Sequence, residues 1–423
     1  MGPPVEEAER ESRRPAQSAS RVTVLKILFV RLAPRRYNVL AMTKNAPDKI
    51  SSALPFRRIV VKLGTSLLTS GSNKLDDARM AGLVAQAAAL HKQDVQMVIV
   101  SSGAVAAGRE KLGLTRKVPG LPYKQVLASV GQSRLMNAYE RLFAPHEITL
   151  AQALLTRSDL CQRAGYLNAR NTLLMLLELG VVPIVNENDV VAVDELHEAR
   201  FGDNDNLSAM VANLIDADLL LILSDIDGLY TDDPHVNPDA TLIAEVPRIT
   251  NEIEAMVGGT AGSLGTGGMV TKIEAAKLAT ACGITTTICS GREPDVIVRV
   301  ARGEGIGTRF LPVSSRLESR QRWMVSGLST KGKLTVDGGA ATALKSQKRS
   351  LLAAGIVAVE GDFERGDLVD ILDGEGRRLG SGIANYPAAD IEKIRGAQSA
   401  EISARLGYEY GSEVIHRNNL VVL

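Results

Sequence analysis

Residues 59–66 have the sequence IVVKLGTS, in which an aliphatic run leads directly into a lysine, a glycine turn and two hydroxyl residues. Nearly continuous aliphatic runs recur along the chain at residues 97–100, 181–185, 219–223 and 284–288. Runs without polar alternation are typical of parallel strands that helices cover on both faces. The first run therefore predicts a buried strand that ends in a tight polar turn.

Helical patterns lie between these runs. Residues 77–91 and 167–179 have apolar side chains at helical spacing, and Gly180 is placed to end the second segment as a left-handed cap. Strands that alternate with helices predict an α/β fold, a doubly wound αβα sandwich with a mostly parallel sheet. Because crossovers in such folds are right-handed, the loops that follow the strands meet at one edge of the sheet, where ligands bind.

The composition is that of an ordinary globular chain. Its 423 residues are 45% hydrophobic and 23% charged, and the length is sufficient for two domains. A net charge of +1 creates no field toward nucleic acid or an anionic membrane, which favours a small-molecule ligand. The three cysteines suit neither a disulfide framework nor a zinc site, and the five histidines lack metal-ligand spacing. We predict a cytoplasmic protein that forms no metal site of its own.

The first 55 residues differ in character from the rest. Residues 1–41 contain eight Lys or Arg against four Asp or Glu, and Lys26 and Arg31 interrupt the apolar run at residues 22–32. That run is too short and too charged for a membrane span or a signal-peptide core. We expect residues 1–55 to be a disordered or non-native extension, with Met42 as an alternative translation start.

Two polar segments lie close together near the middle of the chain. Residues 202–209 have the sequence GDNDNLSA, and residues 185–189 have the sequence VNEND directly after a strand-like run. Asx-rich turns and a helix N-cap would explain either segment alone. Since a packed core needs no such concentration of carboxylates and amides, we interpret the two segments as parts of one ligand pocket.

Glycine-rich turns supply a second set of candidate contacts. Gly64 follows the first predicted strand, and Ser102 and Gly103 follow the second. Such turns expose backbone N–H groups that can bind phosphate or carboxylate, although each taken alone is more often a simple tight turn. Residues 264–272, LGTGGMVTK, precede a helix with a lysine in its first turn. This segment matches neither the Walker A motif nor the dinucleotide fingerprint, so it indicates a phosphate-binding loop of a different kind of kinase.

These segments, together with VIVSSGAVAAGRE at residues 98–110 and DIDGLYTDDP at 225–234, resemble the amino acid kinase family in order and spacing over residues 57–423. The resemblance implies ATP-dependent phosphorylation of the 5-carboxylate of L-glutamate, the first step of proline biosynthesis, with Mg²⁺ bound to ATP. A γ-carboxylate with a pKa of about 4.3 is already ionised at neutral pH and needs no general base. Catalysis would then depend on positioning and on cations at the transferring phosphoryl group.

The same resemblance assigns roles to individual residues. The catalytic set is two lysines and the aspartate that orients them: Lys62, Lys272 and Asp205. In the glutamate site, the α-ammonium group would be bound by Asp189 and Asp203. The α-carboxylate would be bound by Asn186, Asn204, Ser102 and the Gly103 backbone. The ATP contacts would be Lys62, Gly64, Ser224, Asp225, Thr266, Gly267, Gly268, Met269 and Lys272. Proline would be a feedback inhibitor, and the protein a homo-oligomer, a dimer or a tetramer.

The pattern changes after residue 330, where short strand-like segments alternate with glycines. Residues 361–367, GDFERGD, and 406–411, LGYEYG, resemble a PUA domain, which implies a small, mostly β barrel of antiparallel strands. PUA domains often bind RNA, but residues 326–423 carry twelve Lys or Arg against thirteen Asp or Glu, which argues against an RNA partner. We expect a structural or regulatory role for this domain.

The sequence thus predicts four segments: an extension at 1–55, an amino acid kinase domain at 56–315, a linker at 316–330 and a PUA domain at 331–423. Two alternatives to glutamate phosphorylation remain open. One is a family member that acts on a related carboxylate, and the other is an inactive, RNA-associated protein. The presence of Lys62, Asp205 and Lys272 together disfavours the second alternative, because an inactive protein has no reason to keep all three.

Overall fold

The structure is a computed structural model that describes residues 54–114, 120–192, 204–234, 236–258, 267–313, 330–347 and 349–422. The expectations for the N-terminal extension, including Met42, and for the linker fall almost wholly outside these residues. Within them, no helix has the length and apolar character needed to cross a membrane.

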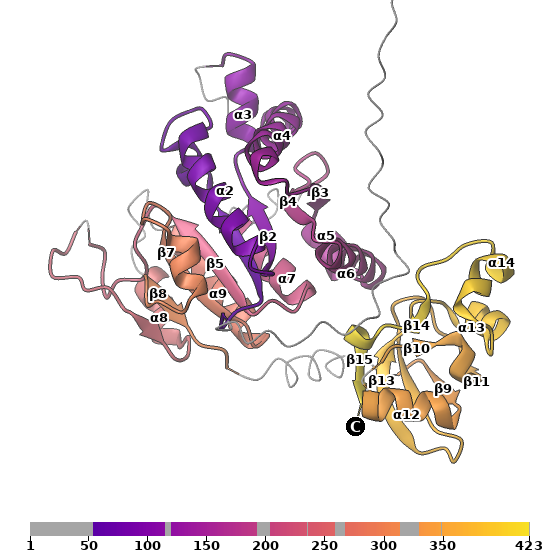
Figure 1. Ribbon diagram of the computed structural model, residues 1–423. Helices are drawn as coiled ribbons and strands as arrows, with labels where there is room; N and C mark the ends of the chain where they lie inside the picture. Colours follow the sequence, from indigo (N-terminus) through magenta and orange to yellow (C-terminus); the bar gives the residue numbers. More distant parts are fainter. Residues whose placement is uncertain are drawn as a thin grey trace, which may run out of the picture. The chain divides into compact units, whose positions relative to one another are not determined.

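An eight-stranded sheet forms the centre of the first part of the chain (Figure 1). The strand order is β3-β4-β2-β1-β5-β7-β8-β6, and every neighbouring pair is parallel except β7 with β8. The strands are β1 Arg58–Leu63, β2 Gln96–Ser101, β3 Leu150–Leu155, β4 Val182–Glu187, β5 Leu219–Ser224, β6 Glu245–Val246, β7 Thr285–Ser290 and β8 Thr308–Phe310. The five aliphatic runs are all strands, and the mostly parallel α/β fold is confirmed.

Helices cover both faces of this sheet. They are α1 Thr65–Thr69, α2 Asp77–His91, α3 Ala104–Lys111, α4 Leu121–Phe143, α5 Arg157–Cys161, α6 Arg163–Glu178, α7 Asn204–Leu214, α8 Asn251–Gly258, α9 Gly267–Ala281 and α10 Val296–Ala301. Apolar side chains of α2, α4 and α10 pack with Val61 on one face, and those of α6, α7 and α9 pack with Val60 on the other. Consecutive residues of β1 therefore face opposite layers, as a strand covered on both sides requires.

The chain reverses its direction of travel across the sheet at β1. After β1 it builds β2, β3 and β4 on one side, and it then returns to form β5 on the other side of β1. Because β1, β2, β4 and β5 are parallel, their carboxyl ends lie at the same edge. In open α/β sheets the crevice at such a reversal is where ligands bind.

The predicted helix at residues 77–91 is α2, and Gly180 has the predicted left-handed conformation, with φ of 71°, just after α6. Sequence reasoning missed β3. This strand lies at the edge of the sheet, and its residues Leu150–Leu155 are partly exposed and alternate in burial. An edge strand needs no continuous aliphatic run, so it lacks the signal that revealed the central strands.

Helices α3 and α4 approach each other at a pair of glycines. A Cβ atom added at Gly131 of α4 would lie 1.7 Å from the carbonyl oxygen of Ala104 and 2.4 Å from the backbone nitrogen of Gly108. No side chain fits at that distance. Because α3 begins directly after the turn that follows β2, this contact also fixes the turn at Ser102 and Gly103.

A five-stranded sheet and a separate two-stranded sheet form the C-terminal part, with orders β11-β9-β12-β13-β15 and β10-β14. The elements are β9 Gly332–Val336, α12 Gly338–Gln347, β10 Leu351–Leu352, β11 Ile356–Gly361, β12 Leu368–Leu372, β13 Arg378–Ile383, α13 Ala388–Ile394, α14 Ile402–Leu406, β14 Glu413–Ile415 and β15 Leu420–Val422. The predicted β-rich character is confirmed. The strands are not all antiparallel, however, because β9 and β12 pair in parallel.

One buried arginine joins elements far apart in the sequence. Arg170 of α6 is 2% exposed, and its Nε donates to Asn419 Oδ1 at 2.8 Å. The same guanidinium group pairs with Asp216 at 2.6 Å and donates to the carbonyl oxygen of Leu214, the last residue of α7. Through Arg170, Asn419 is therefore linked to α7, the helix whose first turn carries Asn204 and Asp205.

The glycine contact generates a stability prediction. We expect Gly131→Ala to lower the free energy of unfolding by about 2 kcal/mol or more, because the new methyl group would collide with the backbone of α3. Urea unfolding followed by circular dichroism measures the change. Gly82→Ala in α2 is the matched control, since nothing lies within 4 Å of its added Cβ. There we expect a gain of about 0.5–1 kcal/mol from the better helix former. Equal effects at both positions would contradict the tight α3–α4 contact.

Candidate active site

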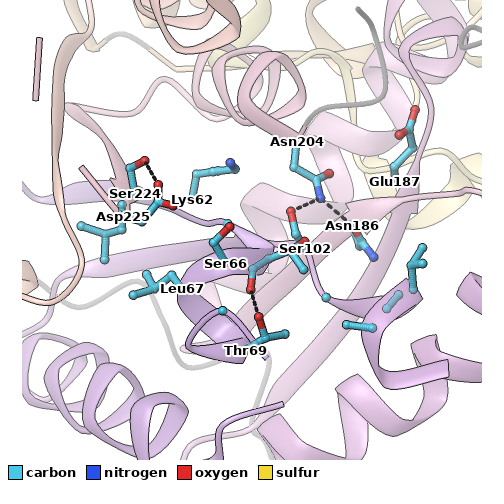
Figure 2. A pocket seen from close by; sticks show the side chains of 18 of the residues that line it. Lys62, Ser66, Leu67, Thr69, Ser102, Asn186, Glu187, Asn204, Ser224 and Asp225 are labelled. Carbon is cyan, nitrogen blue, oxygen red and sulfur yellow. Dashed lines mark hydrogen bonds between the residues drawn. The ribbon is translucent and has the colours of Figure 1, made fainter. Parts of the chain in front are cut away.

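A pocket of about 550 Å³ lies at the carboxyl ends of the central strands (Figure 2). Its walls come from the ends of β1, β4 and β5, the turn after β2, and the helices α1, α3, α4, α7 and α9. Ten residues singled out in the sequence line it: Lys62, Gly64, Ser102, Gly103, Asn186, Asp189, Asn204, Ser224, Asp225 and Lys272. The two polar segments and the glycine turns thus form one cavity.

Asp205 lies beneath this pocket between two lysines. Its side chain is 0% exposed, and its Oδ1 is 2.6 Å from Lys62 Nζ while its Oδ2 is 3.2 Å from Lys272 Nζ. The lysines are themselves buried, with exposed fractions of 3% for Lys62 and 8% for Lys272. Two ammonium groups therefore share the carboxylate of Asp205. Both lysines also line the pocket, and cations fixed at a poorly hydrated site attract anions strongly.

Hydroxyl and carbonyl groups hold this ion pair in place. Thr271 Oγ1 donates to Asp205 Oδ2 at 3.0 Å, and Lys272 Nζ donates to the carbonyl oxygen of Gly268 at 2.9 Å. Ser208 Oγ donates to the backbone carbonyl oxygen of Asp205 at 2.6 Å. The first turns of α7 and α9 are therefore joined to the carboxyl end of β1, and the orientation of both lysines follows.

An amide network forms another wall of the pocket (Figure 2). Asn204 Nδ2 donates to Ser102 Oγ and to Asn186 Oδ1, each at 2.9 Å. Asn186 Nδ2 in turn donates to Gln132 Oε1 of α4 at 2.8 Å. The network links the start of α7, the turn after β2, the end of β4 and α4. Residues from four separate elements are thereby held in one arrangement.

The opposite wall carries Ser224 and Asp225 at the end of β5. Ser224 Oγ donates to Asp225 Oδ1 at 3.1 Å. Figure 2 shows these two residues on one side of Lys62, with Asn204, Asn186 and Glu187 on the other. The pocket therefore has two ends, with the ion-paired lysine between them.

Other predicted contacts are placed differently or lie outside the described residues. Gly267, Gly268 and Met269 begin α9, as expected, but none is among the described lining residues, and Met269 packs against the hydrophobic core. Gly268 still takes part through its carbonyl oxygen, which accepts from Lys272. The predictions for Asp203 and Thr266 fall outside the described residues.

The pocket also contains polar residues to which the sequence suggested no role. Arg109 of α3, Lys124 of α4, Glu187 of β4, and Ser66 and Asn73 near α1 all line it. Arg109 and Glu187 lie inside the segments at residues 98–110 and 185–189, but the sequence does not show which way their side chains point. Lys124 of α4 and Asn73, in the bend between α1 and α2, belong to no motif and reach the pocket only through tertiary packing.

The described residues provide no cage for a metal ion. In that part of the chain, no three His, Cys, Asp or Glu side chains gather where they could bind one.

Comparison with known proteins identifies both parts of the chain. The model of the amino acid kinase family matches residues 57–290, and that of the PUA domain matches residues 332–406. A glutamate 5-kinase of Dehalococcoides mccartyi is 60% identical over 368 residues, which is 87% of this chain and 99% of that protein. A glutamate 5-kinase of Herpetosiphon aurantiacus is 52% identical over 364 residues, 86% of this chain and 98% of that protein. A third, of Citrifermentans bemidjiense, is 50% identical over 367 residues, with 87% and 98% covered.

The buried ion pair generates a second stability prediction. We expect Asp205→Ala to lower the free energy of unfolding by about 3–5 kcal/mol, because it leaves two buried ammonium groups without their carboxylate. Asp225→Ala is the control, since Asp225 lines the same pocket but is exposed. Its effect should stay within about 0.5 kcal/mol. Chemical unfolding at pH 7 without ligands measures the free energy of unfolding of both variants. An unchanged value for Asp205→Ala would rule out the carboxylate as the group that holds the lysines.

Proposed function

The chain belongs to the amino acid kinase family, and from this premise we propose that its pocket transfers the γ-phosphoryl group of ATP to the 5-carboxylate of L-glutamate. The products are ADP and L-glutamyl 5-phosphate, and the reaction is the first step of proline biosynthesis. The observation that carries the proposal is the pair of buried lysines on Asp205 in a pocket with two polar ends. The proposal is also supported by the glutamate 5-kinases that are 50–60% identical to this chain over nearly their whole length.

The chemistry demands electrostatic stabilisation rather than proton transfer. The acceptor carboxylate has a pKa near 4.3 in water and is already a nucleophile at neutral pH. The barrier arises because this anion must approach a polyanion, and the negative charge is spread over the phosphoryl oxygens during transfer. We propose that Lys62 and Lys272 donate to those oxygens and that Asp205 holds the lysines in position. Positively charged groups fixed in advance in this way stabilise the transition state without reorganisation.

The two ends of the pocket suit the two substrates. We propose that ATP lies toward Gly64, Ser224 and Asp225, and that glutamate lies toward Ser102, Gly103, Asn186, Asp189 and Asn204. Lys62 then stands where the γ-phosphoryl group meets the 5-carboxylate. Contributions of Asp203 to glutamate binding, and of Thr266, Gly267, Gly268 and Met269 to ATP binding, remain part of the proposal.

Mg²⁺ fits this arrangement as a companion of ATP. Both oxygens of Asp205 already contact lysines, and the described residues offer no carboxylate cluster for a metal. We propose that Mg²⁺ is held mainly by phosphate oxygens and water, as is usual for this ion at nucleotides. When bound, it would neutralise phosphate charge.

Regulation and assembly extend the proposal. We propose that proline inhibits at the glutamate end of the pocket, and that the protein is a homo-oligomer, a dimer or a tetramer. The PUA domain would serve structure or regulation rather than RNA binding, because its charges nearly cancel.

The activity is tested with purified protein, ATP, Mg²⁺ and hydroxylamine, which traps the acyl phosphate as a hydroxamate. We expect hydroxamate with L-glutamate and none with N-acetylglutamate or L-aspartate. Product from one of the other acceptors but not from glutamate would favour the alternative of a related carboxylate. No product from any acceptor would favour the inactive protein.

The division of labour within the pocket gives a kinetic prediction. Lys62→Ala or Lys272→Ala should lower kcat by about two orders of magnitude or more, since each removes charge stabilisation that matters most in the transition state. Asp189→Ala or Asn204→Ala should mainly raise the KM for glutamate, with the KM for ATP nearly unchanged. Lys277→Ala is the matched control on α9, because that side chain is 59% exposed. Equal effects of all four variants on both substrates would refute the assignment.

A further inference from the structure

The amide network decides which end of an amino acid Asn204 can bind. Asn204 Nδ2 already donates to Ser102 Oγ and Asn186 Oδ1, and a third acceptor, the carbonyl oxygen of Ser101, lies at 3.4 Å. Asn204 therefore has no N–H group left for a carboxylate, because an amide NH2 provides only two donors. Asn186 Nδ2 donates one of its two N–H groups to Gln132 and keeps the other. For Asn204 this differs from the assignment by resemblance, which gave its amide to the α-carboxylate.

The atom of this network that has no hydrogen-bond partner is an acceptor. Asn204 is 8% exposed and lines the pocket, and its Oδ1 is buried without a hydrogen-bond partner among the described residues. A buried unpaired carbonyl oxygen is costly, and a ligand that donates to it recovers that cost. Asp189, a second acceptor that also has an interaction within the protein, lines the same pocket. Together the two oxygen-bearing side chains suit an ammonium group.

The α-carboxylate then needs a cation other than the two catalytic lysines. Four cationic side chains line the described pocket: Lys62, Arg109, Lys124 and Lys272. Lys62 and Lys272 contact Asp205, and Lys124 already interacts with another part of the protein. Arg109 forms no ion pair with any described residue, and its Nε is buried without a hydrogen-bond partner.

The position of Arg109 suits a carboxylate near the start of α3. Arg109 lies in the last turn of α3, and side chains of a helix lean toward its N-terminus. Gly103 and Ala104 at that N-terminus line the pocket, and Gly103 provides no side-chain cap for the first turn. A guanidinium group and uncapped N–H groups thus border the same space. Arginine is well suited to a carboxylate, which it can bind with two parallel hydrogen bonds.

We propose that Arg109 binds the α-carboxylate of the amino acid substrate, while Asn204 Oδ1 and Asp189 bind its α-ammonium group. The inference rests on the proposed function and deepens it, because it names the groups that select an α-amino acid. A dicarboxylate without the ammonium group would lose one contact, and an amine without the α-carboxylate would lose the other.

The test compares Arg109→Gln with Lys111→Gln, which removes the same charge from an exposed position of the same helix. We expect Arg109→Gln to raise the KM for glutamate about 10- to 100-fold, as for loss of a charge-assisted hydrogen bond. The KM for ATP should be unchanged, Arg109→Lys should restore part of the affinity, and Lys111→Gln should behave as the wild type. Thermal unfolding confirms that each variant is folded.

Two competitive inhibitors separate the contacts. Glutarate keeps both carboxylates and lacks the ammonium group, whereas 4-aminobutyrate keeps the ammonium group and lacks the α-carboxylate. Arg109→Gln should weaken inhibition by glutarate at least tenfold and leave inhibition by 4-aminobutyrate unchanged. Asn204→Ala should instead weaken inhibition by 4-aminobutyrate and leave inhibition by glutarate unchanged.

Several outcomes would overturn the inference while the proposed function stands. An unchanged KM for glutamate in Arg109→Gln would show that Arg109 does not contact the substrate. Equal weakening of both inhibitors would show that it acts on the structure of the whole pocket. A higher KM for ATP alone would place its contact on the nucleotide. If the wild type itself forms no product from glutamate, the proposed function fails first, and this inference fails with it.

Discussion

The two salt bridges of Asp205 are the interaction on which the rest of the site depends. One carboxylate that is 0% exposed holds Lys62 at 2.6 Å and Lys272 at 3.2 Å, and the three residues come from a strand and two helices. Burying three charges is expensive unless they are paired and hydrogen-bonded. The fold meets that condition with the hydroxyl group of Thr271 and the carbonyl oxygen of Gly268. The elements that carry the lysines cannot shift independently.

The parallel sheet provides the frame for this pair. The strand order reverses at β1, so its carboxyl end lies beside those of β2 and β5, and loops from distant parts of the chain converge there. The face of β1 that holds Val60 also directs Lys62 toward α7 and α9, since residues two apart on a strand point the same way. Packing β1 against the core on both faces therefore also places Lys62 at the pocket.

Two buried polar atoms of the pocket are left unpaired. Asn204 Oδ1 and Arg109 Nε are both buried without partners among the described residues, and both belong to residues that line the pocket. Because native proteins seldom leave buried polar atoms unsatisfied, these two atoms suit contacts with a ligand. At its other end α7 meets Arg170, which also binds Asn419 near the end of the chain. The helix that begins at the site is thus anchored far from it.

The sequence alone determined the central strands, the helix at residues 77–91, the cap at Gly180 and most of the pocket, because these depend on local signals: aliphatic runs, helical spacing and polar turns after strands. It also indicated the chemistry, since the segments that resemble the amino acid kinase family imply phosphoryl transfer, while the roles of Lys62, Lys272 and Asp205 in it stay a prediction. Only the tertiary structure decided the edge strand β3, the presence of Arg109 and Lys124 in the pocket, and which atoms of Asn204 and Asn186 are still available. The physical reason is that the neighbours of an amide or guanidinium group decide which of its polar atoms remain available to a ligand. Those neighbours, such as Ser102 for Asn204, lie about a hundred residues away and are chosen by packing.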